Sequence, residues 1–389
     1  MAAPQVLIVA AEASSSLYAK RLLELWKKEK FQVSAFGVGS REMEALGFER
    51  LGRSEEMSIV GLQEVLSHYF DLKKVFNQLL EEAERRKPDF ALLMDYSGFN
   101  LRLAERLKAQ GCTVLYFISP QVWAWRKGRI QTIKKCVDKM HVILPFEKKV
   151  YDENQILCEF VGHPLLDELA PSLFDEKARQ FERQKFGFQK NDFVLGLMPG
   201  SRRSELKFHL KAQVDAAQIV IKKHSHIKLA FLVADTFTLE EFRSYLPPIE
   251  IPYVLMRDES PKMVSLTDLI LCASGTATLV VGLIEKPMVI MYKVNALTAF
   301  VGRRLVKVDH FGLINLILGR RAVPELFQEE ASPTRMAEEL EKFVVDQNLY
   351  EKTRLALSEA KARLGSSGAI AKLSASLKHY LKTTGGEVK

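Results

Sequence analysis

The chain has 389 residues, of which 47% are apolar and 27% charged, a composition typical of a soluble globular protein with about two domains. No apolar run approaches the roughly 20 residues that cross a bilayer, and the N-terminus lacks the pattern of a signal peptide. Four scattered cysteines without CxxC spacing indicate buried thiols in a reducing cytoplasm.

The formal net charge of +8 indicates an anionic partner. Nucleic acid, an acidic membrane surface and phosphorylated metabolites would all satisfy this charge. The sequence contains no zinc-ligand spacing, no aromatic RNA-binding motif and no helix-turn-helix signal. We therefore expect no nucleic-acid partner.

Short apolar runs alternate with amphipathic segments in the first half of the chain. Such runs are typical of strands in a parallel sheet. Strands are predicted at 5–10, 31–37, 88–94, 114–118 and 141–144. A helix is predicted from 57 to 80, and its apolar periodicity favours a face packed on the core. Because Lys73 and Lys74 lie on it, a helix on a membrane surface remains the alternative.

Two polar segments follow strands of this half. Asp95 comes directly after the strand 88–94, where an aspartate either caps a helix or faces a ligand. The segment 119–129 places Trp123 and Trp125 beside three basic residues. It suits either a packed corner with a solvated rim or an amphiphile that carries a phosphate.

The second half repeats the alternation, with strands predicted at 193–198, 228–234, 253–256, 268–273 and 288–292. The strand 268–273 runs into Ser274-Gly275-Thr276 and an apolar helix, which is either an ordinary capped turn or an anion site. The strand 193–198 ends in a second such turn, where Gly200, Ser201 and Arg202 suit a phosphate. Two phosphate-binding turns in one domain favour a nucleoside diphosphate.

This alternation predicts an α/β fold with two Rossmann-like parallel-sheet domains. We expect one domain at 1–165 and a second at 166–347. A helical segment at 348–382 is expected to pack back on the first domain, and the tail 383–389 is predicted to be disordered.

The motifs, in this order, resemble the lipid-A-disaccharide synthases, glycosyltransferases with the GT-B fold, in which two such domains face each other across a cleft. The resemblance covers nearly the whole chain, and the segment 119–126 (SPQVWAWR) is its most specific part. It is carried by Ser58–Gly61, Glu64–Leu66, Asp95, Phe99–Asn100, Ser119–Arg126, Leu144–Glu147, Gly162–Pro164, Pro199–Arg202, Glu205, Ala273–Ala277, Arg304–Lys307, Asn315–Leu316, Glu325–Leu326 and Gln328.

The resemblance implies an inverting transfer of 2,3-diacylglucosamine from UDP-2,3-diacylglucosamine to 2,3-diacylglucosamine 1-phosphate (lipid X). The products are the β-1,6-linked disaccharide 1-phosphate of lipid A biosynthesis and UDP. The first domain would bind the acceptor and lipid, and the second the UDP-sugar. Asp95 and Arg202 fall on the family's essential acidic and basic positions, so they are the expected catalytic residues.

The resemblance also implies the binding residues. The UDP-sugar is expected to contact Gly200, Ser201, Ser274, Gly275, Thr276, Asn315 and Gln328. The remaining substrate contacts are expected at Glu12, Ser14, Asn100, Ser119, Gln121, Trp123, Trp125, Arg126 and His163. No Asp-x-Asp motif occurs, so no metal or other cofactor is expected. The family also implies a bacterial cytoplasmic protein, peripheral on the inner face of the inner membrane, and leaves a homo-oligomer open.

The sequence departs from the family pattern at three places. The first loop, 11–16, lacks both glycines and the aspartate of the family's GEASGD, and Gly98 replaces a second aspartate. Val280 replaces a glutamate that can meet the nucleotide ribose. Two alternatives therefore remain: a non-catalytic or weakened lipid- or nucleotide-binding paralogue, and a UDP-sugar epimerase of the same fold.

Overall fold

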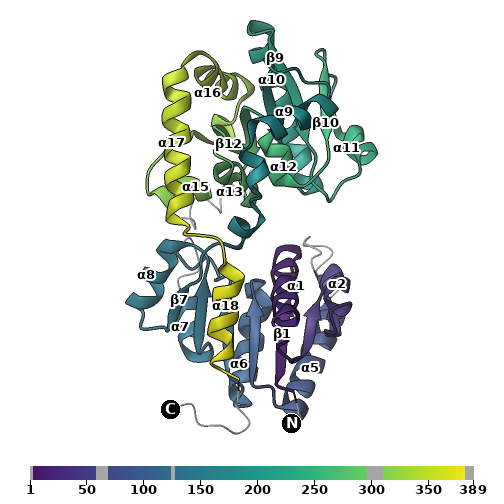
Figure 1. Cartoon of the computed structure of the whole chain (residues 1–389), viewed down its shortest axis with the longest axis vertical. Coiled ribbons are helices and arrows are strands. Elements are labelled where there is room, and N and C mark those ends of the chain that lie inside the picture. Colours follow the sequence, from purple (N-terminus) through teal and green to yellow (C-terminus); the bar gives the residue numbers. More distant parts are fainter. Residues whose placement is uncertain (1–2, 58–68, 124–127, 296–309, 382–389) are drawn as a thin grey trace. The chain divides into compact units, whose positions relative to one another are not determined.

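The computed structural model describes residues 3–57, 69–123, 128–295 and 310–381. The chain divides into two compact units (Figure 1). The first unit contains Met1–Pro164 and Ser366–Lys389, and the second contains Leu165–Gly365. Each unit is built on its own parallel sheet with helices packed on it.

The sheet of the first unit contains seven strands within the described residues, in the order β3-β2-β1-β4-β5-β6-β7. All neighbouring pairs are parallel. The strands β1 and β4 are buried along almost their whole length, which explains why they read as unbroken apolar runs. The strands are β1 (Gln5–Ala10), β2 (Ser34–Gly39), β3 (Glu49–Arg53), β4 (Phe90–Met94), β5 (Val114–Phe117), β6 (Lys139–Val142) and β7 (Cys158–Phe160).

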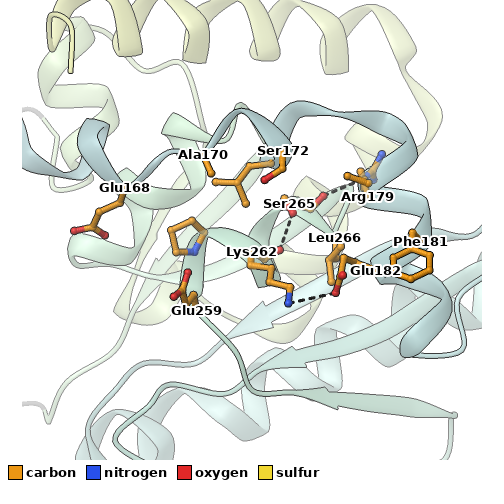
Figure 2. A pocket seen from close by; sticks show the side chains of 13 residues that line it. Glu168, Ala170, Ser172, Arg179, Phe181, Glu182, Glu259, Lys262, Ser265 and Leu266 are labelled. Atoms are coloured by element: carbon orange, nitrogen blue, oxygen red, sulfur yellow. Dashed lines mark hydrogen bonds and ion pairs between the residues drawn. The ribbon is translucent and has the colours of Figure 1, made fainter. Parts of the chain in front are cut away.

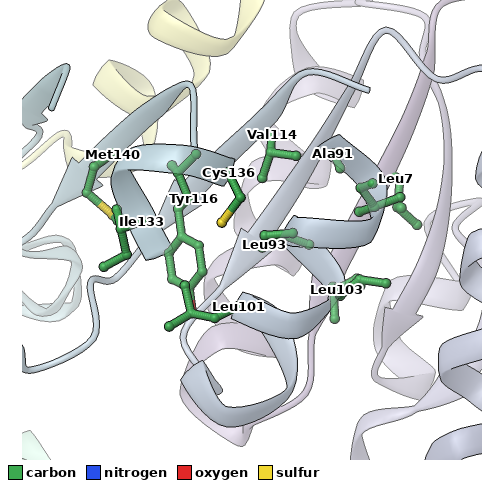
Figure 3. Packing of buried hydrophobic residues seen from close by; sticks show 14 of the residues in the cluster. Leu7, Ala91, Leu93, Leu101, Leu103, Val114, Tyr116, Ile133, Cys136 and Met140 are labelled. Carbon is green, nitrogen blue, oxygen red and sulfur yellow. The ribbon is translucent and has the colours of Figure 1, made fainter. Parts of the chain in front are cut away.

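Helices pack on this sheet and complete its core. In Figure 3, Leu93 of β4 lies near Leu103 in one buried cluster; Leu101 and Leu103 both come from the helix that follows β4. Tyr116 of β5 is fully buried in the same cluster. The helices are α1 (Ala13–Lys28), α2 (Arg41–Glu44), α3 (Ser54–Met57), α5 (Tyr69–Arg86), α6 (Ser97–Ala109), α7 (Arg129–Cys136), α8 (Pro145–Glu153) and α18 (Ala369–Lys378).

The C-terminal helix α18 belongs to the first unit although it follows the whole of the second. The indole Nε1 of Trp26 donates to Ser374 Oγ at 2.9 Å, and His141 Nε2 lies 2.8 Å from Ser376 Oγ. The helix before it, α17, belongs to the second unit. Residues 364–368, which contain Gly365 and Gly368, separate the two helices.

The sheet of the second unit is also entirely parallel, with six strands among the described residues in the order β10-β9-β8-β11-β12-β13. These strands are β8 (Phe193–Met198), β9 (Ile227–Leu232), β10 (Tyr253–Met256), β11 (Leu269–Ala273), β12 (Met288–Tyr292) and β13 (Glu325–Phe327). The α-helices are α9 (Glu176–Lys185), α10 (Arg203–Lys223), α11 (Leu239–Tyr245), α12 (Ser260–Ser265), α13 (Thr276–Leu283), α15 (Leu313–Leu318), α16 (Pro333–Val345) and α17 (Gln347–Arg363). Short 3₁₀ helices occupy Pro164–Glu168, Pro171–Phe174 and Gln328–Glu330.

Most predicted strands appear with ends within a few residues of the expected ones, and three strands were not predicted. The first, β3, reads Glu-Arg-Leu-Gly-Arg and is too polar to be recognised as a buried strand. The other two, β7 and β13, have only three residues each. Part of the predicted helix 57–80 lies outside the described residues, and α5 covers 69–86. Among the helices that the structure describes, none combines the length and apolar character needed to cross a membrane.

Candidate functional site

In each unit, two of the predicted segments lie at the point where the strand order reverses. In open parallel sheets, ligands bind beyond the carboxyl ends of the strands at such a point. In the first unit the reversal lies between β1 and β4, whose last residues, Ala10 and Met94, are direct partners. In the second unit it lies between β8 and β11. The first loop and Asp95 therefore flank the reversal of the first unit, and the turns after β8 and β11 flank that of the second. Other predicted residues, such as Ser119 after β5 and His163 after β7, follow strands beyond the reversal.

In the first unit this arrangement brings two acidic side chains to one edge of the sheet. Glu12 follows β1 and begins α1, while Asp95 follows β4. Burial, and to a smaller extent the negative charge of Glu12, raise the pKa of the Asp95 carboxyl to about 7. A hydrogen bond from the Tyr96 backbone lowers this pKa but does not outweigh the other two effects. A carboxyl with this pKa can exchange a proton near neutral pH, as a general base requires.

The backbone at Asp95 is held in an uncommon conformation. Its φ of 52° and the φ of 40° at Tyr96 lie in the left-handed region, which non-glycine residues seldom adopt. Three hydrogen bonds fix the peptide groups of Asp95. Its N–H donates to Phe117 O at 3.0 Å, and its carbonyl oxygen accepts from Tyr116 Oη at 2.5 Å and from Asn100 Nδ2 at 2.9 Å. Asn100 is thus buried behind Asp95 and positions it.

The altered first loop forms an ordered start to α1. Ser15 Oγ donates to the carbonyl oxygen of Glu12 at 2.9 Å and accepts from its backbone N–H at 3.1 Å. Ser16 Oγ donates to Ala10 O at 2.7 Å. Ser14 is exposed. The serines that replace the family's glycine and aspartate therefore support the backbone that carries Glu12.

A buried carboxyl organises the tryptophan loop. Glu147 of α8 accepts hydrogen bonds from Ser119 Oγ at 2.8 Å and from Trp123 Nε1 at 3.4 Å on one oxygen, and from the Leu144 N–H at 3.1 Å on the other. Burial raises the pKa of Glu147 to about 7 despite these donors. The indole of Trp123 also packs edge-on against Phe146, with ring centroids 5.1 Å apart.

The other predicted residues of the first unit differ in exposure. Gln121 is exposed, whereas His163, which follows β7, is buried. Burial lowers the pKa of His163 to about 4, so its imidazole is neutral at physiological pH. Trp125 and Arg126 lie outside the described residues. In the first unit, Glu12, Asp95, Ser119 and His163 therefore all follow carboxyl ends of strands.

In the second unit, the turn after β8 is closed by an internal carboxylate. Glu205, in the first turn of α10, accepts from the backbone N–H groups of Ser201 at 2.9 Å and Arg202 at 3.2 Å. Gly200 has a φ of 122°, and a Cβ there would lie 2.3 Å from Glu205 Oε2, so the turn requires glycine. Because Glu205 occupies these N–H groups, the side chains of Ser201 and Arg202, both exposed, are what this turn offers to a ligand.

The turn after β11 leads into α13. Ser274 is half-buried and its N–H donates to Met291 O at 2.9 Å, while Gly275 and Thr276 are exposed. The backbone N–H groups at the start of α13 give this turn the partial positive charge of a helix N-terminus. Val280 is 6% exposed and packs into the core, so it offers no polar atom for a ribose.

Asn315 and Gln328 lie on the same unit, and both are engaged by the protein. The Asn315 amide is buried: its Nδ2 donates to Val323 O at 2.9 Å and Glu325 Oε1 at 2.7 Å, and its Oδ1 accepts two backbone N–H groups. No polar atom of Asn315 is left for a ligand in this arrangement. Gln328 has a φ of 54° and donates to Val294 O at 3.0 Å.

Comparisons with known proteins identify the family. A sequence model of the lipid-A-disaccharide synthetase family matches residues 6–376. The lipid-A-disaccharide synthase of Myxococcus xanthus is 37% identical over 97% of this chain and 98% of its own length. That of Geobacter metallireducens is 38% identical over 94% of each chain. The chain belongs to the lipid-A-disaccharide synthase family. It is a glycosyltransferase that depends on a UDP-sugar.

Solved structures agree with a GT-B fold for this member of the lipid-A-disaccharide synthase family. The UDP-GlcNAc 2-epimerase of Neisseria meningitidis, bound to UDP-GlcNAc, aligns with a TM-score of 0.64 at 12% identity over 97% of this chain and all of its own. The glycotransferase of kitacinnamycin aligns with a TM-score of 0.61 at 11% identity over 98% of this chain and all of its own. Such low identity establishes the fold alone.

Two polar groups of the candidate site have no clear signal in the sequence, those of Tyr116 and Glu147. Tyr116 lies inside a buried strand, among apolar side chains of the core (Figure 3). Only the hydrogen bond from its hydroxyl to the backbone of Asp95 distinguishes it from an ordinary core residue. Glu147 lies within a motif that carries the family resemblance, Leu144–Glu147, but the motif by itself does not indicate what Glu147 does. A glutamate one turn into a helix that begins with proline was the available signal.

We predict that Tyr116→Phe lowers the turnover number several-fold and leaves the KM for the UDP-sugar unchanged, because the Asp95 backbone loses one of two donors to its carbonyl. The loss of unfolding free energy should be about 1 kcal/mol. Tyr350→Phe is the matched control, since Tyr350 Oη donates to Asp268 O at 2.8 Å in the second unit. Steady-state kinetics and thermal unfolding of both variants measure this. Equal turnover in the two variants would show that Tyr116 acts on stability alone.

Proposed function

We propose that this chain transfers 2,3-diacylglucosamine from UDP-2,3-diacylglucosamine to lipid X and forms the β-1,6-linked disaccharide 1-phosphate and UDP. The observation that carries this proposal is the match to lipid-A-disaccharide synthases from end to end. The acidic pair of the first unit and the two polar turns of the second supply the chemistry that such a transfer needs.

Asp95 is the proposed general base of the transfer. The acceptor's 6-hydroxyl must lose its proton as its oxygen bonds to C1 of the donor sugar, while the bond from C1 to the UDP oxygen breaks. An attack from the face opposite UDP inverts C1. The raised pKa of Asp95 supports its role, because a carboxylate with a pKa near 7 accepts a proton more readily than an ordinary one. Glu12 is proposed to orient the acceptor beside it.

The second unit is proposed to stabilise the departing diphosphate. Negative charge develops on UDP as its bond to the sugar breaks. The guanidinium of Arg202, at the exposed turn after β8, can form two parallel hydrogen bonds with phosphate oxygens. Ser274, Gly275 and Thr276 are proposed to bind a phosphate at the start of α13. Asn315 is proposed to act indirectly, by holding Glu325 and the segment at Val323.

The lipid part of the substrates is proposed to contact the loop of Trp123. An indole that packs on Phe146 and donates to Glu147 presents an aromatic surface with a polar edge, which suits an acylated sugar at a membrane interface. We propose that the chain is peripheral on the inner face of a bacterial inner membrane. We also propose that it needs no metal, in line with the missing Asp-x-Asp motif.

Disaccharide formation from UDP-2,3-diacylglucosamine and lipid X, in detergent with EDTA present, tests the function. Product in EDTA is the expected outcome. Product that requires added Mg²⁺ would contradict only the metal-independent mechanism. UDP binding without product would indicate a non-catalytic paralogue. Conversion of UDP-N-acetylglucosamine without an acceptor would indicate an epimerase.

Asp95→Asn should reduce the rate of transfer by about 10²–10⁴-fold, the range typical for loss of a general base. Its affinity for UDP should stay within about twofold, because UDP is proposed to bind the second unit. Asp89→Asn is the control, because Asp89 lies just before β4 whereas Asp95 lies just after it. Single-turnover rates and calorimetric UDP titration measure the two effects. Full activity of Asp95→Asn would remove Asp95 from the mechanism.

The pH dependence should report the pKa of Asp95. A base acts only when deprotonated, so kcat/KM should rise with pH below about 7 and level off above it. Glu12→Gln removes a neighbouring negative charge that raises this pKa, so the rise should move to lower pH. Glu24→Gln, on the exposed face of α1, is the control. An unmoved profile in Glu12→Gln would show that the titrating group is not Asp95.

A further inference from the structure

A polar cavity lies at the end of the second sheet opposite to the two turns. Asp268 immediately precedes β11, and Lys286 comes two residues before β12, so both lie at the amino ends of their strands. The cavity has a volume of about 210 Å³ and is lined by their side chains together with Arg179 of α9 and Tyr350 and Arg354 of α17. A water molecule occupies roughly 30 Å³ in the liquid, so the cavity has room for a small polyatomic ligand.

Among the described residues, no carboxylate lies within ion-pair distance of the ε-amino group of Lys286, although Asp268 acts on it electrostatically from farther away. Within the part of the chain that the structure describes, this amino group forms neither a hydrogen bond nor an ion pair. The neighbouring cavity of about 260 Å³ shows the contrast (Figure 2). There Lys262 pairs with Glu182 at 3.2 Å and with Asp258 at 2.7 Å. Lys262 thus forms ion pairs in its cavity, whereas Lys286 in the adjacent cavity forms none with the described residues.

The carboxylates around Lys286 are already committed to other cations. Asp268 pairs with both Arg179 and Arg183 and accepts the Val194 N–H at 2.8 Å. The same holds for the three nearby glutamates. Glu176 pairs with Arg179 at 3.3 Å, Glu285 with Lys361 at 3.6 Å and Glu351 with Arg354 at 3.1 Å. A bound anion could therefore pair with Lys286 without competing with any of these carboxylates.

The surroundings of Lys286 favour an anion. Burial and then the positive charge of Arg179, with smaller effects of Arg183 and Arg354, lower the pKa of Lys286 to about 7 despite Asp268. A bound oxyanion would stabilise the ammonium form of Lys286 and so raise its pKa. The ammonium and the partly exposed guanidinium of Arg354 are donors that suit phosphate oxygens.

We propose that this cavity binds a small oxyanion of the phosphate class, held between Lys286 and Arg354. The site is separate from the turns proposed for UDP, because those turns follow the carboxyl ends of β8 and β11. Binding at the amino ends would tie α17 to the sheet through Arg354. The ligand thereby stabilises the second unit without entering the reaction.

Calorimetric titration of the full-length protein with inorganic phosphate, in chloride-free buffer with UDP at saturation, tests the site. UDP keeps phosphate out of the turns after β8 and β11. We expect one phosphate per chain with millimolar affinity, and proton uptake at pH 8 as Lys286 becomes charged. The uptake appears as a dependence of the binding enthalpy on the buffer's ionisation enthalpy.

Lys286→Gln should weaken phosphate binding at least tenfold and abolish the proton uptake, and Arg354→Gln should weaken binding several-fold. Lys262→Gln, in the adjacent cavity, is the matched control and should bind as the parent does. Circular dichroism and UDP affinity establish that each variant is folded; if Lys286→Gln fails to fold, Arg354→Gln and the proton uptake of the parent decide. Equal binding by Lys286→Gln and the parent, or no phosphate binding by the parent, would overturn the proposal.

Discussion

Parallel strand pairing is the constraint on which both halves of this protein depend. A parallel sheet covered by helices must bury apolar side chains on both faces, so little polar chemistry can lie within its strands. Polar groups are therefore confined to the strand ends. Where the strand order reverses, neighbouring ends are left uncovered, and the register of Ala10 with Met94 brings Glu12 and Asp95 to one such place. The second unit repeats the arrangement with β8 and β11.

The electrostatics of the two candidate sites depend on how far each strand end excludes water and on which carboxylates lie beside it. In the first unit, partial exclusion of water and the carboxylate of Glu12 keep Asp95 close to protonation at neutral pH. In the second, Glu205 occupies the backbone N–H groups of the turn after β8, and the α13 turn contains no such carboxylate. The two turns of the second unit, which look alike as strand-to-helix motifs, thus offer a ligand different groups: side chains from one and a helix start from the other.

The sequence predicted most helices and strands, but it predicted less well what individual polar residues of the candidate site contact. Asp95 and the turn at 274–276 could be placed because unbroken apolar runs predict where parallel strands end. The internal hydrogen bonds of Asn315 could not be predicted, since its partners Val323 and Glu325 reach it only through the fold between α15 and β13. The same holds for Tyr116, whose hydroxyl meets the backbone of Asp95 from a neighbouring strand. Polar networks of this kind join residues that no local pattern connects.

The amino-acid sequence by itself determined the alternation of the longer apolar strands with helices, the family, and the residues that follow the carboxyl ends of those strands. These properties are local, because apolar periodicity and short motifs specify them within a few residues. The tertiary structure alone decided which of those residues are exposed, which carboxyls have raised pKa values, and which lysine of the described residues lies in a cavity without a carboxylate at ion-pair distance. Lys286 illustrates the difference. The sequence shows that it is a basic residue, but only the structure shows that the nearby Asp268 is paired with Arg179 and Arg183 instead. Burial and pairing are properties of neighbours in space, and only folding chooses those neighbours.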